Sequence, residues 1–166
     1  MADRAWATAI VLCASIACAH ADSPLLPPFT HRETSPNGQF VAVSDPNSGT
    51  RVIEAASGKQ LWAIPGWYRD IYLSNDGRHL AIGYDGLNLI PLNADESFEL
   101  ITFLDRGRKL RTVSLHAIVP DKTLLRRTVS HYAWGSITGI DKNNRLVVTR
   151  IDGREFRFNM ATGEAE

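Results

Sequence analysis

The sequence predicts an all-β protein that is exported from the cell that makes it. Three features lead to this expectation: an apolar N-terminal segment, a dense series of turn dipeptides, and short apolar runs without helical periodicity. Alternation of apolar and polar residues between frequent turns is typical of antiparallel hairpins. We therefore expect short strands from residue 39 onward, with at most one or two helical turns after the N-terminal segment.

The first 21 residues have the features of a secretory signal peptide. Arg4 precedes an Ala-rich apolar run over residues 5–19, and Ala19-His20-Ala21 is a small-x-small triplet of the kind that signal peptidase cuts. The run is shorter than the roughly 20 strongly apolar residues of a membrane-spanning helix. We expect cleavage after the triplet and a periplasmic or secreted location. An alternative is lipidation at Cys18, because residues 15–18 resemble a lipoprotein box.

Composition excludes several classes of partner. Cys13 and Cys18 both lie in the predicted signal peptide, so the mature chain has no cysteine and relies on its core. The formal net charge is zero, which gives no electrostatic argument for nucleic acid or an anionic membrane surface. The sequence contains neither a phosphate-binding loop nor a dinucleotide fingerprint. We expect no cofactor, no nucleic acid and, after signal cleavage, no membrane among its ligands.

The chain after the signal peptide divides into a leader and one domain. Residues 22–38 are rich in proline and are expected to form an extended leader, and residues 39–166 an all-β domain with blade-like sheets. The expected strands cover Gln39–Ser44, Thr50–Ala55, Gln60–Ile64, Asp70–Ser74, His79–Tyr84, Leu87–Leu92, Phe98–Leu104, Lys109–Val119, Ser136–Ile140, Arg145–Arg150 and Glu155–Asn159.

Some of these strands repeat. Ser35–Val43 is similar to Ser74–Ile82, which begins 39 residues later, and Asp141–Val148 is a weaker third copy. A period near 40 residues with a strand-turn-strand unit in each copy is typical of β-propeller blades. These segments resemble blades of WD40-like and quinoprotein-like bacterial β-propellers. Residues 124–135 are similar to a segment of uncharacterised small exported bacterial proteins.

The mature chain is too short for a closed ring. Four blades need about 160 residues, more than residues 22–166 supply. We therefore expect a partial β-propeller of two or three blade-like antiparallel sheets, or a sandwich-like stack. The leader, a second copy or a partner would cover its open edges. Alternate strand residues are expected to form the core, namely Val41, Val43, Ile53, Leu61, Ile71, Leu73, Leu80, Ile82, Leu146 and Val148.

The sequence shows no catalytic or metal-binding motif, so we expect no enzyme and no metal site. The serine of Gly135–Gly139 stands one place too early for a nucleophile elbow. Adjacent strand residues point to opposite faces, so Ser130 and His131 are not expected to pair. Residues 45–49 are better explained by a hairpin turn than by a calcium loop. The alternative, a hydrolase, would use His116 or His131 with a carboxylate from Asp70, Asp121 or Asp141.

Two aromatic segments are the candidate partner-binding sites. They contribute Trp67, Tyr68, Arg69, His131, Tyr132 and Trp134. Trp, Tyr and Arg are enriched at protein–protein hot spots, although the same rings can fill gaps between sheets. The favoured function is a non-catalytic protein-binding module, and a structural component of the envelope is another hypothesis. Its partner would be another protein, either a second copy or an exported toxin that the chain would block as an immunity protein. The stretch Leu73–Arg78 is similar to inhibitors of secreted cell-wall amidases.

Overall fold

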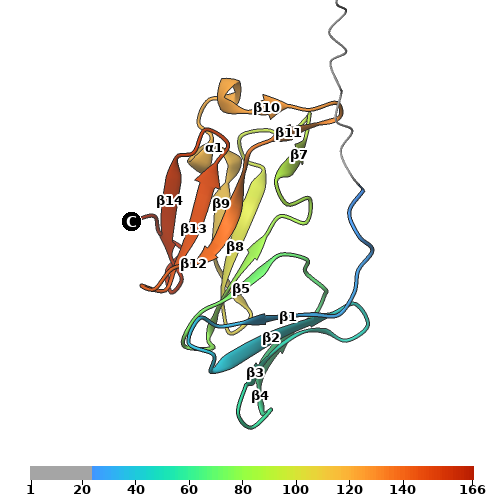
Figure 1. The fold of residues 1–166 in the computed structure, drawn as a ribbon, viewed down its shortest axis with the longest axis vertical. Coiled ribbons are helices and arrows are strands. Elements are labelled where there is room, and N and C mark those ends of the chain that lie inside the picture. The colour runs from blue at the N-terminus through green and yellow to red at the C-terminus, as the bar shows by residue number, and fades with distance from the viewer. Residues whose placement is uncertain (1–23) are drawn as a thin grey trace, which may run out of the picture.

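The computed structural model describes residues 24–166. The predicted signal peptide, its cleavage site and Cys18 lie outside the described residues. From residue 24 onward the chain forms four antiparallel sheets, and none of these sheets closes on itself (Figure 1). The prediction of an all-β fold is confirmed.

Two four-stranded sheets and two three-stranded sheets make up the fold. The N-terminal sheet has the order β1 (His31–Thr34), β2 (Phe40–Asp45), β3 (Gly49–Glu54) and β4 (Gln60–Ile64). The central sheet has the order β5 (Ile71–Leu73), β6 (His79–Gly83), β8 (Glu99–Asp105) and β9 (Arg108–Ser114). The C-terminal sheet has the order β12 (Gly135–Ile140), β13 (Arg145–Arg150) and β14 (Glu155–Asn159). A small sheet has the order β10 (Arg126–Arg127), β11 (His131–Ala133) and β7 (Leu89–Pro91).

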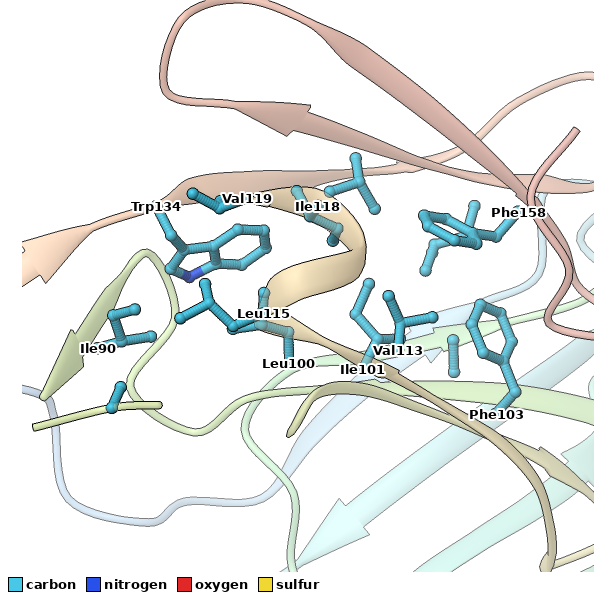
Figure 2. Close-up of a cluster of buried hydrophobic side chains, with 14 of the residues drawn as sticks. Ile90, Leu100, Ile101, Phe103, Val113, Leu115, Ile118, Val119, Trp134 and Phe158 are labelled. Carbon is cyan, nitrogen blue, oxygen red and sulfur yellow. The ribbon is translucent and has the colours of Figure 1, made fainter. Parts of the chain in front are cut away.

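The central sheet is the middle layer of the fold, because its strands β6 and β8 bury side chains on both faces. Leu80 belongs to the core shared with the N-terminal sheet, whereas its neighbour Ala81 belongs to the core shared with the C-terminal sheet. On β8 the ring of Phe103 lies 6.1 Å from the ring of Phe158 on β14. Figure 2 shows the larger core, where Leu115 also points inward. Three sheets are therefore stacked in the order N-terminal, central and C-terminal.

Helix α1 (Leu115–Ile118) replaces the end of an expected strand. The sequence predicts extended structure over Lys109–Val119, but β9 ends at Ser114 and one helical turn follows. Leu115 and Ile118 are 1% and 0% exposed. Residues three apart share one face of a helix, so a single turn buries both side chains, which alternation along a strand would separate. A 3-10 turn, η1 (Lys122–Leu124), comes next.

The leader contributes a strand that the sequence did not predict. Within residues 22–38, strand β1 pairs antiparallel with β2, with Thr34 opposite Val41. This pairing satisfies backbone groups of β2 that would otherwise form an open edge. The sequence did not decide whether the leader, a second copy or a partner covers the open strand edges. At the edge formed by β2, the leader covers it.

The expected core is confirmed in the C-terminal sheet and, apart from Ile82, in the central sheet, and it is partly wrong in the N-terminal sheet. Ile71, Leu73, Leu80, Leu146, Val148 and Val43 are at most 4% exposed. In the N-terminal sheet, however, Ala42 and Val52 face the central sheet, while Val41, Ile53 and, in the central sheet, Ile82 are half-buried. Leu61 is 43% exposed. A β-bulge between β3 and β4 shifts the register beside Leu61, so simple alternation fails there.

Matching turns join the three stacked sheets at one place. In two of the turns the N–H of Ser35 or Ser74 donates a 3.0 Å hydrogen bond to the carbonyl five residues later. The N–H of Asn37 donates to Oδ1 of Asn75 at 2.8 Å. The N–H of Asn75 in turn donates to Oδ1 of Asn144 at 2.9 Å. Each sheet is therefore hydrogen-bonded to the next through its turn.

Candidate binding site

The loop between β4 and β5 carries three of the predicted partner-binding residues. Gly66 begins its change of direction with a φ of +90°, a conformation that favours glycine. The N–H of Tyr68 donates to Oγ of Ser44 at 2.9 Å, and its carbonyl lies 2.8 Å from Nε2 of His31. The loop is thus fixed to the N-terminal sheet by backbone groups, which leaves its side chains to make other contacts.

The leader lies against Trp67 and Arg69. Nε1 of Trp67 donates to the carbonyl of Phe29 at 2.8 Å, and a guanidinium nitrogen of Arg69 donates to the carbonyl of Leu26 at 2.8 Å. The guanidinium also stacks over the Trp67 ring, 4.9 Å from its centroid. The two side chains therefore hold a segment of their own chain. The side chains of Leu25, Leu26 and Phe29 remain 46%, 68% and 49% exposed.

A trough between the N-terminal and central sheets begins at this leader contact. Two adjoining hollows of about 550 Å³ and about 330 Å³ share Tyr68, Ile82 and Thr102 as lining residues. The first extends to Trp67 and the leader, and the second to Ile64 at the end of β4. The two hollows adjoin at these shared residues, and together they are called the trough below. The sequence did not reveal that Ile82 and Thr102 line the trough. Alternation along a strand shows which face of the sheet a residue occupies, but not where a hollow lies between two packed sheets.

Ion pairs neutralise the charged groups beside the trough. Nε of Arg69 lies 3.0 Å from a carboxylate oxygen of Asp85, and Nζ of Lys109 lies 3.1 Å from one of Glu99. All four residues line the trough, together with apolar side chains such as Leu104. The charges are paired within the protein, so the apolar lining is the main feature that the trough offers to a ligand.

The second predicted segment does not form a surface of the same kind. Trp134 is 2% exposed, and its Nε1 donates to the carbonyl of Leu87 at 2.7 Å. Figure 2 shows its ring among Leu115 and Val119. Tyr132 is half-buried and packs against the same core. The prediction that Trp134 contacts a partner does not fit this burial, because the ring already fills the space between sheets.

Ser130 and His131 lie closer together than the sequence predicts. Ser130 Oγ is 2.9 Å from Nδ1 of His131, although neighbouring strand residues were expected to point apart. The expectation fails because β11 begins at His131 and Ser130 belongs to the preceding bend. His131 itself is half-buried.

The carboxylates named for a hydrolase have structural partners of their own. Asp70 accepts a 2.7 Å hydrogen bond from the hydroxyl of Tyr72, and Asp141 accepts one of 2.7 Å from Arg145. Asp121 accepts from the N–H of Thr123 at 2.8 Å at the start of η1. The other histidine of that hypothesis, His116, is exposed, and its Nδ1 lies 3.8 Å from Glu96.

Two neighbouring carboxyl groups, those of Asp70 and Glu33, have raised pKa values because each is partly buried. Desolvation raises the pKa of the Asp70 carboxyl, although the hydrogen bond from Tyr72 and the nearby His31 oppose this rise. Burial likewise raises the pKa of Glu33, and Asp70 adds to that effect. A Cβ atom at Gly83, which lines the trough, would lie 2.1 Å from Oδ2 of Asp70. The Asp70 carboxylate therefore packs closely against the backbone of the trough lining.

The segment considered as a calcium loop is a hairpin turn. Residues 45–49 form the end of a hairpin, where Asp45 accepts hydrogen bonds of 2.9 Å from the N–H groups of Asn47 and Ser48. Among residues 24–166, no group of three His, Cys, Asp or Glu side chains is placed to hold a metal ion. In the same range no helix is long and apolar enough to cross a membrane.

No protein-family model matches the chain, and no curated protein matches its sequence.

Proposed function

We propose that the protein is an exported, non-catalytic binding module whose trough takes an extended, apolar segment of another protein. The observation that carries this proposal is that the two hollows of the trough adjoin. Tyr68, Ile82 and Thr102 join its two hollows between two sheets. Two hollows side by side suit an extended peptide segment better than a compact small molecule.

The surroundings of the trough favour a protein as the occupant. The exposed side chains of Leu25, Leu26 and Phe29 lie on the leader at its end, where Pro28 is part of the lining. Contiguous exposed apolar surface beside polar groups marks protein interaction sites. Trp67 adds a ring of the type that dominates such interfaces. Paired charges beside the trough make a strongly charged ligand a poor match.

We propose in addition that the fold is a partial β-propeller of three blade-like sheets. Each of the three stacked sheets is a series of sequential antiparallel strands, apart from β7, which leaves the central series for the small sheet. The bonds that link the turns at Asn37, Asn75 and Asn144 support equivalent positions for the three sheets. Such turns lie side by side in a propeller, where blades are arranged around an axis.

Selection of displayed random peptides against residues 22–166 tests the proposed function. We expect the selected peptides to be apolar and extended, and Thr102→Trp to abolish their binding because the larger ring fills the trough. Trp67→Ala should weaken binding by about 2 kcal/mol or more. Calorimetric titration with one selected peptide measures both effects.

A matched control separates the trough from the rest of the surface. Val129 is 64% exposed and lies outside the trough, so Val129→Ala should leave peptide affinity unchanged. The melting temperature of Thr102→Trp should stay close to that of the unchanged protein, since the half-buried Thr102 faces the trough. Peptides that bind Thr102→Trp as tightly as the unchanged protein would contradict the proposal.

A further inference from the structure

A second groove, of about 280 Å³, lies between β4 and two turns of the central sheet. Lys59 and Trp62 line it from the N-terminal sheet side, and Arg78 and Arg106 line it from the turns. It shares no lining residue with the trough. Its chemistry also differs, because cationic side chains outnumber carboxylates here.

Two of the cations in this groove are available for a ligand. Lys59 and Arg106 make no ion pair with any residue in the range 24–166. Arg78 is held 2.7 Å from a carboxylate oxygen of Asp105. The carboxylate in the lining, Asp76, has its own partner in Nδ1 of His79 at 2.7 Å. Lys59 and Arg106 therefore present uncompensated positive charge to the groove.

The backbone at Arg106 gives an independent argument for a function of this turn. Arg106 has a φ of +46° and Gly107 a φ of +83°, in the two-residue turn between β8 and β9. Such turns favour Asn, Asp or Gly at both positions, because a side chain strains a left-handed backbone. Strained residues of this kind cluster at functional sites. Arginine at this position adds strain and supplies a charge that the fold does not use.

We propose that this groove binds a carboxylate-bearing segment of a protein partner. The planar guanidinium of Arg106 can accept a carboxylate in a two-pronged hydrogen bond, and Lys59 adds a second charge. Beside them lie the half-buried Trp62 ring and the Leu61 side chain, which is 43% exposed. These apolar groups suit the aliphatic part of an acidic peptide and would contribute nothing to a free inorganic anion.

Nuclear magnetic resonance of the Trp62 indole N–H tests this assignment. This group donates to the carbonyl of Gly77 at 2.8 Å, and both residues line the groove, so its resonance reports on the groove directly. Titration of residues 22–166 with a capped Glu-Leu repeat peptide should move the resonance. The corresponding Lys-Leu peptide and inorganic phosphate should not move it. A shift of equal size with phosphate would overturn the proposal in favour of a simple anion site.

Arg106→Gly is the decisive variant, because it should change binding and stability in different directions. We expect the affinity for the Glu-Leu peptide to fall about tenfold or more with the loss of a charge-assisted contact. The melting temperature should stay equal or rise, because glycine adopts a positive φ without strain. Lys142→Ala, which removes an exposed charge outside the groove, is the matched control and should leave the affinity unchanged. Unchanged affinity of Arg106→Gly would overturn the proposal, whereas Thr102→Trp tests only the trough.

Discussion

Replacing Leu80 with alanine should lower the free energy of unfolding by about 2–5 kcal/mol. Leu80 is 0% exposed and packs with Ile71, Leu73 and Leu104 between the N-terminal and central sheets. Truncation removes apolar contacts and leaves a cavity that surrounding strands cannot fill without breaking their ladders. Urea unfolding followed by tryptophan fluorescence measures the difference.

Leu61 provides a matched control for this change. Leu61 is 43% exposed beside the bulge in β4, so Leu61→Ala should cost no more than about 0.5 kcal/mol. The sequence places Leu61 and Leu80 in the core alike, and only the register of the folded sheets distinguishes them. Equal losses from the two truncations would show that the bulge is misplaced.

Gly135→Ala should cost about 3–5 kcal/mol, through backbone strain and a steric clash together. Gly135 has a φ of +153°, and a Cβ atom there would lie 2.3 Å from the carbonyl oxygen of Thr149 and 2.9 Å from Cα of Arg150. Both atoms belong to the backbone of the paired strand β13, so no side-chain rotation relieves the contact. Thermal and urea unfolding of the variant both measure the loss.

Gly139 separates the two causes of this effect. It lies on the same strand with a φ of +125°, but a Cβ atom there would meet nothing within 4 Å. Gly139→Ala should therefore show strain alone, of about 1–3 kcal/mol. A loss as large as that of Gly135→Ala would mean that the close approach of β12 and β13 contributes nothing.

The strands that the sequence predicts best lie between clear turn residues. Gln60–Ile64, Arg145–Arg150 and Glu155–Asn159 have the expected bounds. Local alternation and turn chemistry suffice for such strands, since both act over a few residues. Strand β1 was missed because its pairing with β2 depends on contacts that the proline-rich leader does not reveal.

Three of the six residues that the sequence nominates for partner binding lie at the proposed site. Trp67, Tyr68 and Arg69 line the trough, as residues on a connection between sheets often do. Trp134 has the same residue type but lies in the core. Residue type alone does not distinguish an aromatic ring that fills a gap in the core from a ring that lines a groove. That distinction depends on packing between sheets, which a single sequence does not show.

Photo-crosslinking in the native cell tests the trough most directly. Benzoylphenylalanine in place of Tyr68 puts the reactive group where the two hollows meet, and the same group at the exposed Val129 is the control. We expect an adduct from position 68 whose crosslinked peptide is an apolar segment of another protein. This adduct should be lost when Thr102→Trp is added. An adduct that persists with Thr102→Trp, or that forms equally from position 129, would contradict binding in the trough.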